Sequence, residues 1–255
     1  MVVAILLAGG SGQRLGVGLP KQFVSVLGKP IIVYTLERLS ESPLIDSIVV
    51  VCVESYINNL RDLVHTYQLA KVSDIVPGGS TFGLSFRRGV DSLDGRCAID
   101  DVILLHMASS PLVPLDVIDD VVTTCATQGN AFSAVPSYAC MCQMTGPGFS
   151  DKELDRNLIF GLMTPQAVQY GKLVDLYQRA DDRGYDFHNR QHLSTLMSDM
   201  GERMFFAKSS PLNIKITTQD DLALVSAYLS MKHGNPSTNT TLTEWQEGDT
   251  PTCST

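Results

Sequence analysis

The stretch LLAGGSGQRL, residues 6–15, follows the apolar run at residues 2–5 and comes shortly before LPKQF, residues 19–23. An apolar run of this kind is typical of a buried strand. The glycines that end it allow main-chain N–H groups to approach an anion closely. Arg14 and Lys21 can then neutralise a chain of phosphate oxygens. The segment therefore predicts a strand that ends in a phosphate-binding loop, with a nucleotide as its ligand.

Two common glycine motifs do not match this loop. A Walker loop requires Lys followed by Ser or Thr after its last glycine, and neither Gly16 nor Gly18 has that pair. A dinucleotide fingerprint requires G-x-G-x-x-G, whereas Gly16 comes one residue late. The stretch instead matches, at every position, the pattern L-x-A-G-G-x-G-x-R-[LM] with a later P-K, which is typical of nucleotidyltransferases.

Size and composition limit the alternatives. The 255 residues, of which 44% are hydrophobic, suffice for one large α/β domain or for one domain with an appendage. A net charge of −8 argues against nucleic acid as a partner. No apolar run reaches the ~20 residues that a membrane span needs. The start, MVVAILLAGG, has no basic residues, so we expect a strand there rather than a signal peptide, and a cytoplasmic protein.

Strand and helix patterns alternate along the first half of the chain. Strands are predicted at residues 2–7, 47–53, 72–76, 101–106 and 131–136, and helices at residues 30–39, 56–67, 80–93 and 113–127. This rhythm predicts an α/β fold with a doubly wound, mostly parallel, Rossmann-like sheet. Right-handed crossovers then bring the loops after the strands to one edge of the sheet, where such folds bind ligands.

The second half is less regular. Residues 137–162 are polar and contain Gly-Pro-Gly, which predicts a protruding arm subdomain. Helical order is expected to resume at residues 164–166, because Pro165 suits a helix start. A late strand is predicted at residues 213–217 and a last helix at residues 219–231. The polar, nearly aliphatic-free residues 234–255 predict a disordered tail after a nucleotidyltransferase domain of residues 1–233.

The chain resembles the cytidylyltransferases that make CDP-methylerythritol or CDP-ribitol. Besides the first motif, the resemblance rests on the strand that ends in His106 with Pro111 after it, and on the blocks GKPIIVYTLERL, GGSTFGLSFRRGV, DRNLIFGLMTPQ and NIKITTQDDLAL. The sequences LPKQF and KPII are more similar to the ribitol-phosphate branch of the family than to the methylerythritol branch. The resemblance implies transfer of CMP from CTP to a phosphorylated polyol with release of pyrophosphate, in teichoic acid, capsule or isoprenoid biosynthesis.

The resemblance also implies roles for individual residues. The triphosphate and the reacting phosphorus would be held by the catalytic cations Arg14, Lys21 and Lys215. The nucleotide would be bound by Leu7, Ala8, Gly9, Gly10, Gly79, Ser80, Ser85 and Ala108. The phosphate of the acceptor would be held by Arg156 and Thr164, from the arm of a neighbouring subunit, so we expect a homodimer.

Several positions depart from the family pattern. His106 is usually followed by Asp and, three residues later, by Arg, whereas this chain has Met107 and Ser110 there. Magnesium prefers oxygen ligands, and a thioether is a poor one. We therefore expect no metal ligand from the protein at this position and a divalent cation carried mainly by the CTP phosphates. Phe82 replaces an arginine, and the usual patterns are also absent at residues 139–142 and 188–189.

Because the nucleotide side is retained and the acceptor side is rewritten, three functions stay open. The first is a cytidylyltransferase acting on an alditol phosphate such as ribitol or glycerol phosphate. The second is the methylerythritol-phosphate enzyme, and the third is a nucleotide-binding homologue with little catalysis. Two further groups are expected to be structural: His106 as a packed core histidine, and Asp220 and Asp221 as acidic residues at a helix start.

Overall fold

The structure is a computed structural model that describes residues 1–10 and 19–233. The predicted tail at residues 234–255 lies outside this part of the chain. None of the helices within the described residues is both long enough and apolar enough to span a bilayer.

The centre of the molecule is a seven-stranded sheet in the order β11-β7-β10-β6-β1-β4-β5. Neighbouring strands run parallel except β10, which is antiparallel to both β6 and β7. The mostly parallel sheet is therefore confirmed. Its strands are β1 (Val2–Ala8), β4 (Ser47–Cys52), β5 (Val72–Pro77), β6 (Val102–Met107), β7 (Asn130–Pro136), β10 (Phe160–Gln169) and β11 (Phe206–Lys208).

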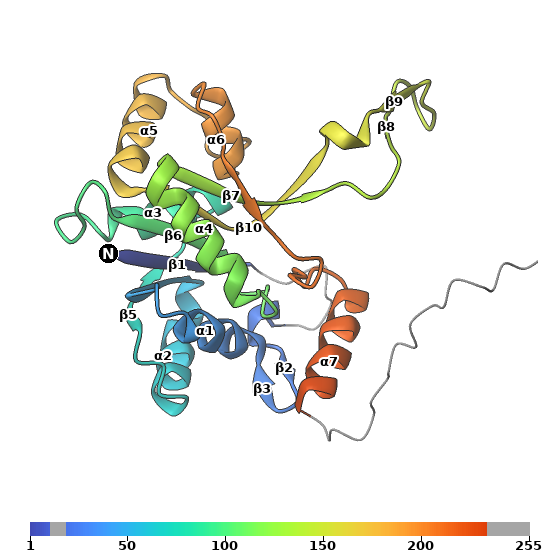
Figure 1. Ribbon diagram of the computed structural model, residues 1–255. Helices are drawn as coiled ribbons and strands as arrows, with labels where there is room; N and C mark the ends of the chain where they lie inside the picture. Colours follow the sequence, from blue (N-terminus) through green and yellow to red (C-terminus); the bar gives the residue numbers. More distant parts are fainter. Residues whose placement is uncertain (11–18, 234–255) are drawn as a thin grey trace, which may run out of the picture.

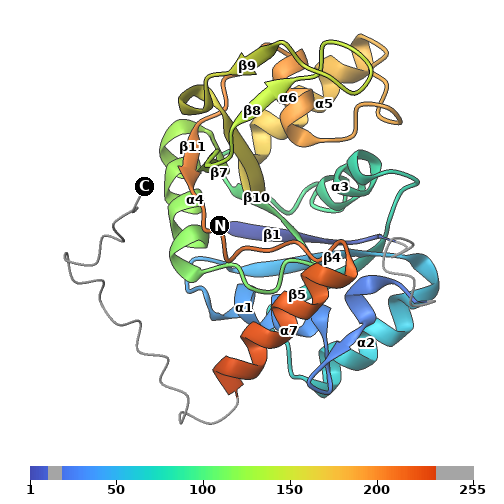
Figure 2. The same ribbon diagram turned by 90° about the vertical axis from the view of Figure 1, so that its right-hand side faces the viewer.

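Helices cover both faces of the sheet (Figure 2). One face packs against α1 (Ile31–Glu41), α2 (Ile57–Thr66) and α4 (Leu115–Gln128). The other packs against α3 (Phe82–Asp91), α5 (Tyr170–Asp182) and α6 (Leu193–Asp199). Alternate residues of β1 enter the two cores, Ala4 and Leu6 on one side and Val3 and Ile5 on the other, as the two-residue period of a strand requires. The doubly wound architecture is confirmed.

Two local predictions are wrong. Pro165 does not begin a helix: it lies inside β10, and α5 begins only at Tyr170. The register of β10 against β7 shifts between Leu162 and Gln166. A proline is tolerated at such an irregularity, because no ladder hydrogen bond is required from its nitrogen.

Residues 213–217 have no regular secondary structure and do not form a strand. The amide of Ile216 donates to the carbonyl of Ser109 (2.9 Å). The Ile216 side chain is buried among apolar side chains of α1 and of α7 (Gln219–His233). This segment therefore joins the core by packing against helices and not as a strand of the sheet.

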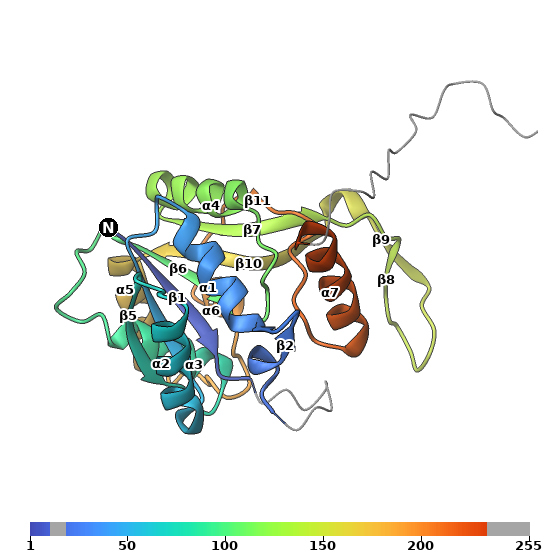
Figure 3. The ribbon, with the colours of Figure 1, turned by 90° about the horizontal axis from the view of Figure 1, so that it is seen from below.

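A two-stranded arm leaves the sheet between β7 and β10 (Figure 1). Its strands are β8 (Met141–Gln143) and β9 (Lys152–Leu154), which pair antiparallel. A second small hairpin, β2 (Ser25–Val26) and β3 (Lys29–Pro30), precedes α1. Figures 1 and 3 show that the arm and α7 both lie on the side of the molecule towards which β1 runs.

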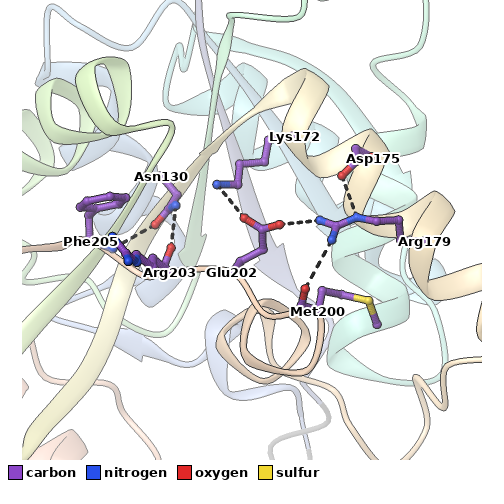
Figure 4. Close-up of polar contacts among 8 residues, drawn as sticks. All are labelled: Asn130, Lys172, Asp175, Arg179, Met200, Glu202, Arg203 and Phe205. Carbon is purple, nitrogen blue, oxygen red and sulfur yellow. Dashed lines mark hydrogen bonds and ion pairs between the residues drawn. The ribbon is translucent and has the colours of Figure 1, made fainter.

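The connection from α6 to β11 is fixed by polar contacts (Figure 4). The Glu202 carboxylate accepts from Lys172 (3.0 Å) and Arg179 (2.6 Å), both on α5, and these bonds hold the pKa of Glu202 below its ordinary value. The Asn130 side chain donates to the carbonyl of Arg203 (3.0 Å) and accepts from the amide of Phe205 (3.1 Å). These contacts anchor the segment before β11 beside β7.

His106 is completely buried near the end of β6. Its Nε2 lies 3.0 Å from the carbonyl oxygen of Ser110, which can only accept, so Nε2 carries a proton. Its Nδ1 has no hydrogen-bond partner within residues 1–10 and 19–233. Burial lowers the pKa of His106 from 6.5 to about 4. The prediction of a packed, hydrogen-bonded histidine is confirmed.

This histidine makes the stability of the fold depend on pH. As pH falls from 6.5 towards 4, the unfolded chain binds a proton at His106 that the folded chain excludes, so stability is lost over that range. We expect the free energy of unfolding to be about 2 kcal/mol lower at about pH 5 than at about pH 7.5 on this account alone. Urea unfolding of the wild type and of His106→Gln at both pH values measures the difference. Equal losses in the two proteins would contradict this assignment.

Candidate active site

The loops that follow β1, β5 and β6 surround a cavity of about 300 Å³, which we call the glycine cavity. Leu7 of β1 lines it, together with Gly9 and Gly10, the two residues that follow the strand. The other described lining residues come from the loop after β5, the start of α3, the end of β6 and the connection before α6, namely Gly79, Ser80, Thr81, Phe82, Ser85, Met107 and Gln191. The carboxyl ends of parallel strands thus meet where the fold predicts a ligand site.

The side of this cavity formed by the start of α3 is held together by Ser85. The Ser85 hydroxyl donates to the carbonyl of Thr81 (2.7 Å) and accepts from the amide of Gly79 (3.0 Å). The Thr81 hydroxyl in turn caps α3 by accepting from the amide of Leu84 (3.2 Å). Ser85 therefore shapes the Gly79 loop, besides lining the cavity as the sequence predicts.

A second cavity of about 330 Å³, which we call the lysine cavity, adjoins the first. Phe82 and Met107 line both cavities and so mark their junction. The rest of the lysine cavity is lined by Ser110, Leu162, Met163, Thr164, Gln166, His192, Ser194, Asn213 and Lys215. Among these described residues, only Lys215 and His192 can carry positive charge. The described lining of the two cavities contains no carboxylate. Both cavities therefore suit an anionic ligand.

Lys21 connects the two ends of the chain at this site. Its Nζ donates to the carbonyl of Ile216 (2.6 Å), the residue after Lys215. Its Cε lies 3.8 Å from where a Cβ on Gly10 would stand. The ammonium group from the loop after β1 is thus held beside the segment that carries Lys215.

That segment is fixed at both ends. The Asn213 side-chain amide donates to the carbonyl of Thr164, and its Oδ1 has no partner among the residues described. The Asp221 carboxylate accepts from the amides of Thr217 and Thr218 (both 2.8 Å). Burial would raise the pKa of Asp221, but these hydrogen bonds hold it below its ordinary value. The expected helix-start role is confirmed for Asp221.

The structure brings most of the predicted nucleotide-binding residues together. Leu7, Gly9, Gly10, Gly79, Ser80 and Ser85 line the glycine cavity. Ala8 and Ala108 do not line it: both are buried, and their carbonyls accept from Gln22 (2.5 Å) and Thr35 (2.9 Å), respectively. Any contribution of these two alanines is therefore to the backbone that supports the site.

The predicted acceptor residues are placed differently from each other. Thr164 lies on β10 rather than on the arm and lines the lysine cavity of its own chain, and a role for it across a subunit interface stays a prediction. Its position follows from β10 entering the sheet where a helix was expected. Arg156 is exposed on the arm and lines neither cavity, so its role stays a prediction. Arg14 lies outside the described residues.

Several lining residues were not predicted from the sequence, among them Gln191, His192 and Ser194. Gln191 and His192 belong to the connection between α5 and α6, which has no recognisable motif spacing, and Ser194 lies at the start of α6. The backbone supplies the reason for their position. A Cβ on Gly83 would lie 2.8 Å from the Gln191 carbonyl oxygen, so glycine there allows this connection to pack directly on the start of α3.

Comparison with known proteins identifies the family. The profile of the family described as 2-C-methyl-D-erythritol 4-phosphate cytidylyltransferase (IspD) matches residues 2–231. The chain belongs to this family. Among its relatives, a ribitol-5-phosphate cytidylyltransferase of Lacticaseibacillus paracasei is 38% identical over 232 residues, covering 91% of this chain and 99% of that protein. A 2-C-methyl-D-erythritol 4-phosphate cytidylyltransferase of Clostridium acetobutylicum is 32% identical over 224 residues, covering 87% and 94%.

Solved structures agree on the fold. The crystal structure of 4-diphosphocytidyl-2C-methyl-D-erythritol synthase from Anaerococcus prevotii superposes with a TM-score of 0.76 at 22% identity, covering 90% of this chain and 98% of that one. The crystal structure of the Francisella tularensis 2-C-methyl-D-erythritol 4-phosphate cytidylyltransferase superposes with a TM-score of 0.71 at 26% identity, covering 89% of this chain and 98% of that one. The protein is thus an enzyme of the cytidylyltransferase family, and the family resemblance drawn from its motifs is confirmed.

The glycine cavity of this cytidylyltransferase depends on the absence of a side chain at Gly79. A Cβ there would lie 2.7 Å from the Leu84 Cβ, so the loop would have to shift. We expect Gly79→Ala to weaken CTP binding roughly tenfold, because overpacking costs about 1–3 kcal/mol. Titration calorimetry with CTP measures this.

Gly161→Ala is the matched control, because its new Cβ would meet Val135 at an ordinary 3.5 Å. We expect this variant to bind CTP as the wild type does. If Gly79→Ala also kept full affinity, the Gly79 loop would not be part of the nucleotide site.

Proposed function

We propose that the protein transfers CMP from CTP to a phosphorylated polyol, with D-ribitol 5-phosphate as its acceptor, and releases pyrophosphate. The observation that carries this proposal is the pair of adjoining cavities, which meet at Phe82 and Met107 and have lysines from both ends of the chain beside them. CTP occupies the glycine cavity and the acceptor occupies the lysine cavity. The α-phosphorus then lies at their junction.

The reaction needs positioning and positive charge more than it needs a base. The phosphate oxygen of the acceptor is already anionic at neutral pH and attacks the α-phosphorus in line. The new P–O bond forms as the bond from the α-phosphorus to the bridging oxygen breaks, and pyrophosphate leaves with that electron pair. Negative charge spreads over the phosphoryl oxygens in the transition state. Lys21 and Lys215 stabilise this charge, and the two cavities hold the reactants in contact.

The choice of acceptor rests on similarity and on the lining of the lysine cavity. The relative from L. paracasei, named for ribitol 5-phosphate, is 38% identical, against 32% for the C. acetobutylicum protein named for methylerythritol phosphate. The neutral polar lining, including Ser110, Gln166 and Ser194, suits the hydroxyl groups of a polyol. Pyrophosphate release from CTP with ribitol, glycerol and methylerythritol phosphates tests the proposal. A higher kcat/KM for ribitol 5-phosphate is expected, and no release with any of them would refute it.

The lysines provide a sharper test of the chemistry. We expect Lys21→Ala and Lys215→Ala each to lower kcat roughly 100-fold or more, as the loss of one fixed transition-state contact does. Thermal unfolding should change little, because neither side chain is fully buried. Lys29→Ala is the control, since its Nζ pairs with Glu37 (2.8 Å), whereas Lys215 lines the lysine cavity and Lys21 lies beside Gly10 of the glycine cavity. Near-normal kcat in either lysine variant would contradict the assigned role. Arg14 is proposed to act with them.

The described residues do not fit a magnesium ion held by the protein. They contain no group of three or more His, Cys, Asp or Glu side chains that could hold a metal, and Met107 presents a thioether at the cavity junction. Magnesium prefers oxygen ligands and binds readily to phosphates. We therefore place the divalent cation with the substrate, as the magnesium complex of CTP.

Restoring a carboxylate at the junction should change this behaviour. We expect Met107→Asp to raise kcat or to lower the magnesium concentration needed for half-maximal rate, because a carboxylate adds an oxygen ligand beside the phosphates. Met107→Asn, with nearly the same shape and no charge, is the control. Rates measured across a magnesium titration compare the two. Identical curves would show that position 107 does not face the phosphates.

Self-association through the arm is a further part of the proposal. The arm exposes several large apolar side chains, among them Tyr138 (76% exposed), Met144 (74%) and Leu158 (78%). A lone two-stranded hairpin has little stability in water, which favours its burial against a second copy. Arg156, on the same arm, would then serve the partner's acceptor. Light scattering should find two chains per particle, and one chain at assay concentrations would contradict this. A cytoplasmic location stays a prediction.

A further inference from the structure

His192 is the second group in the lysine cavity that can carry positive charge. Every other described side chain lining the cavity, apart from Lys215, is neutral. The acceptor of the proposed reaction brings a phosphate into this space, and a phosphate needs several donors to replace its water. Lys215 alone provides one ammonium group. A phosphate in this cavity would therefore need a further hydrogen-bond donor, and an imidazole N–H can supply one.

The position of His192 relative to the junction is defined by Phe82. The two rings are in contact, with centroids 5.3 Å apart and planes inclined by 50°. Phe82 is one of the two residues shared by both cavities. His192 thus packs against a residue of the junction, where the acceptor phosphate must meet the α-phosphorus.

The connection that carries His192 is held in place by its own contacts. The Thr81 hydroxyl donates to the carbonyl of Phe187 (3.1 Å). The Arg190 guanidinium forms two hydrogen bonds to the Asp199 carboxylate on α6 (both 2.5 Å). Gln191 packs against Gly83, and α6 begins directly after His192, at Leu193, so the residues on both sides of His192 are fixed. A ring presented by such a support loses little conformational entropy on binding.

We infer that His192 binds the phosphate of the acceptor, donating a hydrogen bond from its imidazole at the junction of the two cavities. This inference rests on the proposed function, because it assigns the lysine cavity to a phosphorylated polyol. His192 complements Lys215, which serves the reacting phosphorus. It is an acceptor-binding residue that the motifs of the sequence do not reveal.

Steady-state kinetics with CTP and D-ribitol 5-phosphate test the assignment. Loss of a hydrogen bond to a charged group should raise the KM for the acceptor roughly tenfold or more in His192→Ala. The KM for CTP and the thermal midpoint should stay as in the wild type. His192→Gln, whose amide N–H can donate, should recover most of the acceptor affinity. His188→Ala is the matched control, because His188 is exposed on the same connection and lines neither cavity.

A binding measurement separates this inference from the proposed function. NMR of the imidazole groups during titration with D-ribitol 5-phosphate should shift the His192 resonances, identified by their loss in His192→Gln, and leave those of His188 in place. Binding of this kind without turnover would refute the proposed function and retain the inference. Turnover in which His192→Ala matches His188→Ala, or an unmoved His192 signal at saturating acceptor, would overturn the inference.

Discussion

The hydrogen bond from the Lys21 ammonium to the Ile216 carbonyl is the constraint on which the site depends. It joins the loop after the first strand to the segment before the last helix, and it places Lys21 beside Gly10 and next to the residue that follows Lys215. A charge-assisted bond of this kind is short and directional. The segment that accepts it has no strand partner, and it is fixed instead by Asn213, Ser109 and the Asp221 cap. The cations are thereby positioned without belonging to one element.

The glycine cavity and the lysine cavity differ in how they are built. The glycine cavity has glycines and hydroxyl-bearing residues among its lining, and the contacts of Ser85 with Gly79 and Thr81 set its shape. The lysine cavity is lined by residues of α3, of β6 and the loop after it, of β10, of α6 and the connection before it, and of the segment before α7. Where the family pattern differs, Met107 lies at the junction of the two cavities and Ser110 lies in the lysine cavity, so both changes leave the Gly79 loop and the glycines after β1 in place.

The sequence predicted the fold where local pattern and burial agree. The strands at β1, β4 and β6 are continuous apolar runs, and their helices carry a clear apolar face, so period and packing specify the same structure. Prediction was wrong at Pro165, where a sheet irregularity accommodates a residue that usually starts helices. It was wrong again at residues 213–217, where two helices rather than a strand bury Ile216. His192 could not be found in advance, because only the contact with Phe82 brings it to the cavity.

The most direct test of the account is a crystal structure of the protein with magnesium and a non-hydrolysable analogue of CTP. Both Lys21 and Lys215 should have their ammonium nitrogens about 3 Å from oxygens of the bound phosphates, with the base in the glycine cavity. The bond from Lys21 to Ile216 should persist, because an ammonium group has three protons to donate. A complex in which the nucleotide lies elsewhere, or in which either lysine points away from it, would contradict the central claim.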